Sequence, residues 1–212
     1  MEYDVVVVGG GPSGLATAIK FAQLNKQNGT DYSICLLEKG SEIGAHILSG
    51  NVFQPNALDE LIPNWKELNA PLNVPVTKDK IYYLLKNIGI PVPPFVMPNL
   101  NNHGNYVISL GNLCRWLGEQ AENLGVEVFP GFPASKLIFE NDEVVGVQTG
   151  DMGVSESGEL KPGHELGIEI KAKMTILGEG CRGHLGKQII NKYNLSDGKD
   201  PQHYGIGFKE VW

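Results

Sequence analysis

The 212-residue chain has little cysteine, little positive charge and no long apolar run. Its three cysteines, Cys35, Cys114 and Cys181, are far apart and odd in number, so the sequence offers neither a disulfide framework nor a C-x-x-C metal site. A formal net charge of −7 argues against a nucleic-acid partner, which would require a basic face. No apolar run approaches the ~20 residues of a membrane-spanning helix.

Targeting signals, internal repeats and low-complexity tracts are also absent from the pattern. Met1 directly precedes the first predicted strand, so no signal or transit peptide is expected. With 42% hydrophobic and 8% aromatic residues, the chain can bury an ordinary core. The composition therefore predicts one domain, with space for an inserted subdomain.

The sequence does have a glycine-rich stretch directly after a β-branched run. Val5 to Val8 is the continuous run expected of a strand buried on both faces of a parallel sheet. A dinucleotide-binding fingerprint and the opening of a helix follow at Gly9, Gly11, Pro12, Ser13 and Gly14. In this spacing the first glycine makes a tight turn, the second admits a pyrophosphate, and the third lets helix and strand pack closely. The helix start directs free N–H groups at the phosphate.

The fingerprint belongs to a complete βαβ unit. A second apolar strand, Ser33 to Leu37, ends on Glu38, 24 residues after Gly14 and close to the ~20 expected for a carboxylate that binds ribose hydroxyls. The alternative interpretation of Glu38 is an ordinary exposed acid after a strand. A carboxylate there would repel a 2′-phosphate, so NADP is disfavoured, while FAD and NAD both remain.

A loop of small residues follows Glu38, where a flavin ring could meet the backbone closely. An NAD enzyme would leave such a segment unexplained. The candidate cofactor contacts in this loop are Lys39, Gly44, Ala45, His46, Ser49 and Gly50. His46 is as consistent with a structural role as with a hydrogen bond to flavin or substrate.

Several further motifs, spread over the whole chain, are similar to those of one family. They are Glu38 to Gly50, Pro63 to Lys66, Ala70 to Thr77, Asn101 to Tyr106, Trp116 to Glu122, Gly178 to Leu185 and Tyr204 to Trp212. Together they resemble the electron transfer flavoprotein–ubiquinone oxidoreductases. The resemblance implies an enzyme in which FAD passes electrons from reduced electron transfer flavoprotein to ubiquinone. It also implies a monotopic protein, expected here on the cytoplasmic face of a bacterial inner membrane.

The resemblance adds cofactor contacts in the second half of the chain. It implies that Arg115 pairs with the pyrophosphate, that Ala134 meets the adenine, and that Gly178, Glu179 and Gly180 form a second close approach to the cofactor. The alternative for Arg115 is a solvated helix arginine. Because the chemistry belongs mainly to the cofactors, no acid–base catalyst and no metal ligand is nominated.

An apolar stripe between the nucleotide unit and a Pro-rich stretch has two interpretations. Its members recur at helical spacing: Leu58, Leu61, Ile62, Trp65 and Leu68. Periodicity alone favours packing into the core. The family resemblance reverses this preference and implies a helix in the membrane interface, with Trp65 at headgroup depth.

The predicted fold is α/β: a Rossmann-like FAD-binding domain with a parallel sheet, a β-hairpin insertion and part of a quinone- and membrane-facing subdomain. The predicted division is 1–70 for the βαβ unit, flavin loop and interface helix, 71–105 for a Pro-rich excursion, 106–195 for the rest of the FAD domain, and 196–212 for the start of a quinone-facing part. Within it, Ile81 to Leu85 is expected as a strand, Gly150 to Gly167 as a loop and Gly205 to Trp212 as a strand.

The resembled family continues well beyond the length of this chain. The chain is therefore expected to be an N-terminal part, with a [4Fe–4S] cluster held only by residues outside it. The alternatives are a flavoenzyme of the geranylgeranyl-reductase kind, which shares the fold, and a non-catalytic flavin- or membrane-binding fragment.

Overall fold

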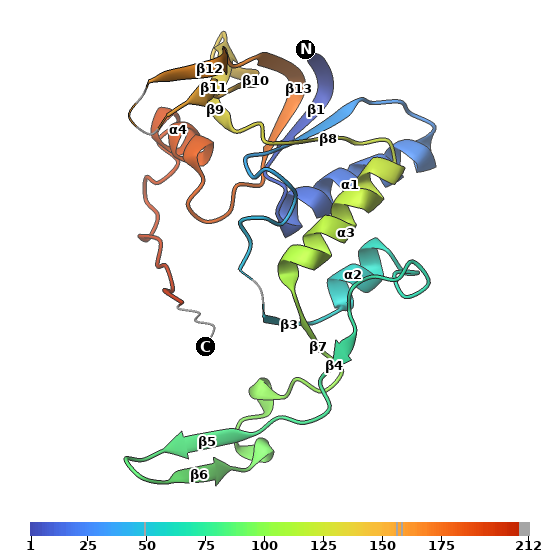
Figure 1. Cartoon of the computed structure of the whole chain (residues 1–212), viewed down its shortest axis with the longest axis vertical. Coiled ribbons are helices and arrows are strands. Elements are labelled where there is room, and N and C mark those ends of the chain that lie inside the picture. The colour runs from blue at the N-terminus through green and yellow to red at the C-terminus, as the bar shows by residue number, and fades with distance from the viewer. Residues whose placement is uncertain (49, 156, 158, 208–212) are drawn as a thin grey trace.

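The computed structural model describes residues 1–48, 50–155, 157 and 159–207. Figure 1 shows a central sheet with helices packed on it, and a thin excursion that leaves this body and ends in a separate hairpin. The helices are α1 (Pro12–Asn28), α2 (Asn56–Leu61), α3 (Leu110–Asn123) and α4 (His184–Lys192), with short 3-10 turns η1 (Pro94–Val96) and η2 (Pro98–Leu100). Ser49 lies outside the described residues, as does most of the strand predicted at 205–212.

The central sheet has six strands in the order β8-β2-β1-β13-β10-β9. Their bounds are β1 (Glu2–Val8), β2 (Ile34–Glu38), β8 (Glu127–Pro130), β9 (Ala134–Glu140), β10 (Glu143–Thr149) and β13 (Glu169–Leu177). The first four in this order are parallel, and β10 and β9 add an antiparallel hairpin at one edge. The α/β Rossmann-like prediction is confirmed, with a mixed rather than wholly parallel sheet.

Strand β1 is buried on both faces, as its β-branched run predicts. Val5 and Val7 face a core formed with α1 and α3. Val6 and Val8 face a second core formed with β9, β10, β13 and α4. Because side chains alternate along a strand, one apolar run supplies both cores.

Helices α1 and α3 cover the same face of the sheet and contact each other. Pro12 stands at the start of α1, where its missing N–H costs no hydrogen bond, and Gly29 ends the helix with a φ of 65°. The hydroxyl oxygen of Ser109 caps α3 by accepting the N–H of Asn112 at 3.3 Å. The helix pair therefore fixes the layer that supports the glycine-rich turn.

The stripe expected to face lipid is packed into the protein instead. Leu58, Ile62 and Trp65 are buried in the core that contains α1 and α3, and Leu61 is half-buried against it. Only Leu68, with 41% of its surface exposed, stays on the outside. The prediction of a lipid-facing Trp65 is wrong, and the interpretation that periodicity alone favours is correct.

Polar contacts show why Trp65 belongs to the core. Its indole Nε1 donates to Asp59 Oδ1 at 2.7 Å, and its ring meets that of Tyr106 edge-on at 5.9 Å between centroids. The helix also stops early: α2 ends at Leu61, and turns follow to Asn69. Pro63 interrupts the helix, so the five apolar residues do not form one continuous amphipathic face.

The excursion begins and ends in a small three-stranded sheet, β3-β7-β4. Its strands are β3 (Asn51–Phe53), β4 (Val74–Pro75) and β7 (Tyr106–Ile108), all antiparallel to their neighbours. Beyond it, β5 (Ile81–Leu84) and β6 (Gly89–Val92) form an isolated hairpin, followed by η1 and η2 (Figure 1). The strand at β5 was predicted, whereas β6 was not, because Pro91 indicates a loop; proline is tolerated on an edge strand.

The segment predicted as a loop at 150–167 contains a second hairpin. It is formed by β11 (Met152–Val154) and β12 (Leu160–Glu165), which pair antiparallel with a register shift. The loop prediction is therefore wrong in part. Its glycines mark irregular pairing here: Gly153 and Gly163 both have positive φ.

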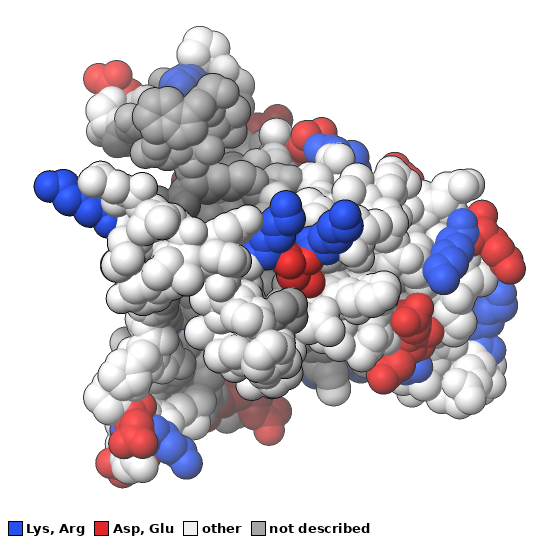
Figure 2. Space-filling view, turned by 90° about the horizontal axis from the view of Figure 1, so that it is seen from below, with Lys and Arg blue, Asp and Glu red and all other residues white. Residues whose placement is uncertain are grey.

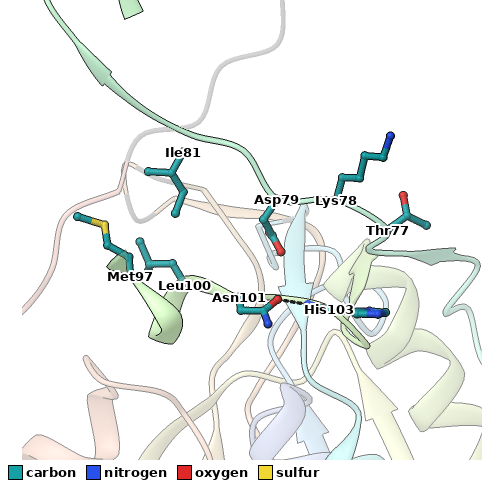
Figure 3. Close-up of a pocket in the computed structure, with 8 residues that line it drawn as sticks. All are labelled: Thr77, Lys78, Asp79, Ile81, Met97, Leu100, Asn101 and His103. Atoms are coloured by element: carbon teal, nitrogen blue, oxygen red, sulfur yellow. Dashed lines mark hydrogen bonds between the residues drawn. The ribbon is translucent and has the colours of Figure 1, made fainter. Parts of the chain in front are cut away.

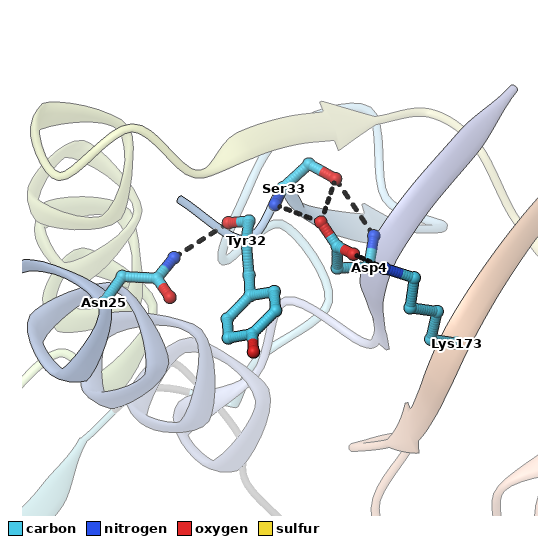
Figure 4. A network of polar contacts seen from close by, with 5 residues as sticks. All are labelled: Asp4, Asn25, Tyr32, Ser33 and Lys173. Atoms are coloured by element: carbon cyan, nitrogen blue, oxygen red, sulfur yellow. Dashed lines mark hydrogen bonds and ion pairs between the residues drawn. The ribbon is translucent and has the colours of Figure 1, made fainter. Parts of the chain in front are cut away.

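A polar network closes the amino-terminal end of the parallel strands (Figure 4). Asp4 Oδ2 accepts hydrogen bonds from the backbone N–H and the hydroxyl of Ser33, at 2.8 and 3.0 Å. The ammonium group of Lys173, on β13, lies 2.6 Å from Asp4 Oδ1. The network ties β1 to the start of β2 and to β13, at the end of the sheet remote from the glycine-rich turn.

No helix among the described residues is long and apolar enough to cross a membrane. The same residues contain no group of three or more His, Cys, Asp or Glu side chains placed to hold a metal ion.

Candidate functional site

Three glycines bring separate segments into backbone contact at the carboxyl ends of β1 and β13. A Cβ on Gly9 would lie 2.5 Å from the carbonyl oxygen of Gly178, and one on Gly14 would lie 1.9 Å from that of Gly9. Gly9 also has a φ of 108°, which favours glycine. The turn after β1, the start of α1 and the loop after β13 therefore pack more closely than any side chain permits.

Gly11 has the opposite surroundings. A Cβ placed on it would meet nothing within 4 Å, and its backbone is extended at φ −84° and ψ −180°. As the N-cap of α1 it supplies no side-chain hydrogen bond to the first turn, which also lacks acidic residues. Pro12 and Ser13 beside it are exposed. An open space thus lies against an uncapped helix N-terminus, the arrangement that favours an anion.

Glu38 joins the glycine-rich turn to the loop that follows β2. Its Oε2 accepts the backbone N–H of Gly10 at 2.7 Å, and its Oε1 accepts that of Gly40 at 2.7 Å. The carboxylate is half-buried and held by two charge-assisted bonds. Each carboxylate oxygen can accept a further hydrogen bond, so the group is oriented and still able to bind hydroxyls.

The loop after β2 lies on the first turn of α3. Gly44 has a φ of 87°, and a Cβ there would be 2.4 Å from the carbonyl oxygen of Gly111. Ile43 is buried against α3, next to Gly118. The loop's predicted contact residues, Lys39, Ala45, His46 and Gly50, are exposed. The structure thus anchors the loop at Ile43 and Gly44 and leaves its small residues accessible.

Arg115 is engaged with an acid of this same loop. Its Nη2 lies 3.0 Å from Glu42 Oε1, and its Nη1 donates to Asn112 Oδ1 at 3.0 Å. It lines a shallow cavity of about 150 Å³ together with Glu42, Ile43, Gly118, Glu119, Glu122, Val128 and Pro130. The structure therefore brings Arg115 to the flavin loop through Glu42, and its pairing with a pyrophosphate stays a prediction.

Of the remaining predicted residues, Ala134 lies in the antiparallel part of the sheet, and Gly178 to Gly180 follow the carboxyl end of β13, beside β1. Ala134 begins β9, where it pairs with Thr149, and Gly180 has a φ of 82° with open space beside it. Glu179 has a role that the sequence analysis did not assign. Its Oε1 accepts the N–H groups of His184 and Leu185, and its Oε2 accepts that of Gly186. The side chain thus caps α4, so a cofactor contact at Glu179 falls to its backbone.

Three positioning residues escaped the sequence analysis: Gly10, Gly40 and Gly111. Gly10 and Gly40 donate to Glu38, and a Cβ on Gly10 would lie 2.6 Å from Ile43 Cδ1. A signal for Gly10 was present in the uninterrupted Gly9-Gly10-Gly11 run. Nothing local marks Gly111, because its partner Gly44 is far away in the sequence.

Comparison with known proteins agrees with this geometry. Residues 7–66 match the family described as an NAD(P)-binding Rossmann-like domain. Over its entire length, the chain is 57% identical to the electron transfer flavoprotein-ubiquinone oxidoreductase of Pseudomonas aeruginosa and 50% identical to the mitochondrial protein of that name from Bos taurus. The predicted resemblance is confirmed. The chain spans 39% and 34% of the lengths of these two relatives.

Solved structures of lower identity share the fold. A geranylgeranyl bacteriochlorophyll reductase-like protein from Thermoplasma acidophilum superposes with a TM-score of 0.63 at 24% identity, covering 88% of this chain and 41% of its own. A myxobacterial FAD-dependent halogenase gives 0.60 at 17% identity, covering 88% and 39%. These likenesses establish the fold and carry no activity to this chain.

Proposed function

We propose that this chain is the FAD-binding part of an oxidoreductase that passes electrons from reduced electron transfer flavoprotein to ubiquinone at a membrane surface. The observation that carries the proposal is the 57% identity, over the whole chain, to a protein named for that activity. The geranylgeranyl-reductase alternative rests on a likeness of 24% identity, which supports a shared fold alone. The fragment alternative concerns activity in isolation and leaves the cofactor assignment unchanged.

The residues present fit a flavin dinucleotide. The space beside Gly11 and the uncapped start of α1 suit a pyrophosphate, bound through the N–H groups of the first turn. Glu38, oriented by Gly10 and Gly40, suits the ribose hydroxyls and disfavours a 2′-phosphate. The exposed loop around Ala45 and His46 suits the flavin ring. Bound FAD would supply the electron-transfer chemistry, while the chain supplies binding, orientation and access.

Two contacts with α3 would hold the proposed flavin-binding loop, which follows β2, in a fixed position. The Gly44–Gly111 contact fixes the loop backbone on α3, and the Arg115–Glu42 pair fixes its outer side to the same helix. Arg115 would then act on the cofactor by positioning the loop, and direct pairing with the pyrophosphate is the alternative role. Ala134 and the Gly178–Gly180 backbone complete the proposed set on the β13 side.

We locate the membrane contact of this proposed function in the excursion rather than at 58–68. The hairpin β5–β6 and the turns after it expose a set of apolar side chains, which we call the apolar hairpin surface: Tyr82, Tyr83, Leu84, Leu85, Ile88, Ile90, Phe95, Val96, Met97 and Leu100. Leu84 is 77% exposed and Phe95 is 81% exposed. Figure 2, which views the molecule from the hairpin end, shows broad white areas without Lys, Arg, Asp or Glu, together with separate charged groups near the middle and on the right. An apolar surface of this size on a thin projection suits interfacial insertion.

The remaining parts of the proposal concern the whole protein. In a bacterium the membrane would be the inner membrane, approached from its cytoplasmic face. Residues 71–105 would form the quinone- and membrane-facing excursion. A [4Fe–4S] cluster is not assigned to the described residues, whose cysteines stand apart from one another.

The test uses the purified protein that carries this chain. Denaturation should release FAD, and reduced electron transfer flavoprotein should reduce a soluble ubiquinone analogue only when the protein is added. Flavin release without any quinone reduction would overturn the assigned activity. Recovery of a nicotinamide dinucleotide with no flavin would overturn the cofactor itself.

A further inference from the structure

A small amphipathic cavity lies at the root of the apolar hairpin surface. It has a volume of about 200 Å³ and is lined by Thr77, Lys78, Asp79, Ile81, Met97, Leu100, Asn101 and His103. Figure 3 shows it between the strand that leads into β5 and the segment that returns from η2. Ile81, Met97 and Leu100 supply an apolar wall, and the other residues supply polar groups. The cavity thus lies where the β5–β6 hairpin joins the rest of the protein.

We propose that this cavity binds the headgroup of an anionic phospholipid and so sets the depth at which the hairpin sits in the bilayer. The inference rests on the proposed membrane association and names the lipid class that it recognises. The ligand chemistry is a phosphodiester with acyl chains attached. A lipid is favoured over a free phosphate because the apolar wall is continuous with the exposed hairpin.

Charge supports an anionic ligand. Between residues 74 and 108 the chain has Lys78, Lys80 and Lys86 against one acid, Asp79, so the excursion carries +2 in a protein of net charge −7. Among the described residues, these three lysines form no ion pair. An anionic membrane surface attracts the basic excursion and repels the acidic body. The protein therefore approaches with the apolar hairpin surface toward the membrane.

The acid in the cavity, Asp79, is held by hydrogen bonds from Asn102, which lower the pKa of its carboxyl group and so favour the charged form. Asp79 accepts the backbone N–H of Asn102 through Oδ2 at 2.9 Å and its side-chain Nδ2 through Oδ1 at 3.0 Å. Among the described residues, Asp79 forms no ion pair with Lys78. A headgroup hydroxyl, such as those of phosphatidylglycerol, can donate to the same carboxylate.

Donors for the phosphate stand on the other side of the cavity. Lys78 lies at the rim, where Figure 3 shows its side chain extending outward with the ammonium group at its tip, and Thr77 and His103 add a hydroxyl and an imidazole. Asn101 Oδ1 accepts the backbone N–H of His103 at 3.0 Å, which fixes the Asn101 side chain and leaves its amide hydrogens to be donated to a ligand. Together these four side chains offer an ammonium, a hydroxyl, an imidazole and an amide to the oxygens of a phosphodiester.

The experiment compares vesicle binding of the FAD-bound protein to three compositions: phosphatidylcholine alone, or with 30 mol% (about a third) phosphatidylglycerol or phosphatidylethanolamine. The wild type should prefer the phosphatidylglycerol vesicles. Lys78→Gln should weaken binding to them about fivefold, with binding to phosphatidylcholine unchanged. Lys26→Gln, which removes the same charge from the exposed end of α1, should leave all three affinities unchanged.

Three results would overturn the inference. If Lys78→Gln and Lys26→Gln weaken binding equally, the preference for phosphatidylglycerol reflects the net charge of the protein and not the cavity. If phosphatidylglycerol and phosphatidylethanolamine strengthen vesicle binding equally, the cavity does not select an anionic headgroup. Release of the protein by millimolar glycerol phosphate (on the order of 10 mM) would make free phosphate the ligand. In each case persistent binding to phosphatidylcholine and retained FAD would leave the proposed function standing, whereas failure to bind any vesicle would overturn both.

Discussion

At the scale of single residues, neighbouring glycines of one motif meet different surroundings. Gly14 is confined, since its Cβ would overlap the carbonyl oxygen of Gly9, whereas Gly11 has only open space around it. Glycine at position 14 therefore serves the fold. Glycine at position 11 serves the proposed binding of the pyrophosphate, because it leaves the space beside it open. The two functions can therefore be separated by the same substitution at each site.

We expect Gly11→Ala to leave the free energy of unfolding of the FAD-free protein within about 0.5 kcal/mol of wild type. Its FAD affinity should fall about tenfold or more, because the added methyl group occupies the approach of the pyrophosphate. The matched variant Gly14→Ala should instead lose more than about 3 kcal/mol through backbone overlap. Urea unfolding and fluorescence titration of FAD measure both quantities. Unchanged FAD affinity in Gly11→Ala would contradict the assigned position of the pyrophosphate.

The cysteines give a second prediction at this scale. Burial, together with the charge of Glu127, raises the pKa of Cys35 to about 12, and burial with Glu38 raises that of Cys114 to about 11. Cys181 is exposed. At pH 8 the two buried thiols should therefore remain protonated and resist alkylation, so iodoacetamide labels one of this chain's three cysteines in the native protein and all three after denaturation. Mass spectrometry of the labelled peptides should find the native label on Cys181, and a label on Cys35 would refute this account.

At the scale of elements, helical periodicity shows that a segment has an apolar face. It does not show whether that face packs against the protein or lies on the outside. The stripe around Trp65 has the spacing of an interfacial helix, yet it fills a core beside Tyr106. The β5–β6 hairpin has no comparable periodicity and exposes more apolar surface. Which apolar segment meets the outside depends on contacts between distant residues, and those are not encoded in local spacing.

The hairpin prediction has a matched control in the β11–β12 region. Leu84→Asp with Phe95→Asp should weaken liposome binding about a hundredfold or more, since each inserted side chain contributes about 1.5–3 kcal/mol. Leu160→Asp with Leu166→Asp makes the same changes at positions 66% and 75% exposed, away from the hairpin. This control should float with liposomes like the wild type, and bound FAD should be unchanged in both. If both double variants lose liposome binding equally, the apolar hairpin surface is not the membrane contact.

Local sequence patterns were sufficient to predict the βαβ unit. They were insufficient to predict the contacts that hold its loops. Val5 to Val8, the fingerprint glycines and Glu38 are read from neighbouring residues, because strand burial, turn and helix start are local properties. The contact of Gly44 with Gly111 joins residues far apart in the sequence and forms only after the chain has folded. Glu179 caps α4 from only five residues before its first residue, but the position directly before the helix is Gly183, which has no capping side chain to mark it. The sequence therefore predicted where a dinucleotide belongs and missed what holds its loops in place.

At the scale of the whole molecule, exposed ion pairs set a pH window for stability. The hydrogen bond to Lys173 lowers the pKa of Asp4, and the corresponding bond to Lys192 lowers that of Asp142, both from 3.8. Bonds to Glu140 and Asp4 raise the pKa values of Lys171 and Lys173 from 10.5. Lowered acid pKa values stabilise the fold above about 3.8 and lose that contribution as pH falls further. Raised lysine values stabilise it below about 10.5 and lose that contribution as pH rises.

The free energy of unfolding should therefore form a plateau between these limits and fall at both ends. Asp4→Asn should flatten part of both limbs, because it removes the partner of Lys173 (Figure 4). The effect should be small, since the Lys173 side chain is largely exposed and solvent screens the pair. Chemical unfolding at a series of pH values is the measurement. Identical profiles for Asp4→Asn and wild type would show that the pair is not formed in solution.

The excursion leaves and rejoins the body through two adjacent strands. Val74 pairs with Val107, Pro75 pairs with Tyr106, and the N–H of Val76 donates to the carbonyl oxygen of Asn105 at 2.8 Å. Because these strands are antiparallel, a two-residue turn can replace everything from 77 to 104. Shortening that 28-residue connection to two residues would lower the loop-closure cost by about 2 kcal/mol. The segment proposed to meet the membrane is thus an insertion between two paired strands, and it can be shortened without changing the pairing that holds its two ends.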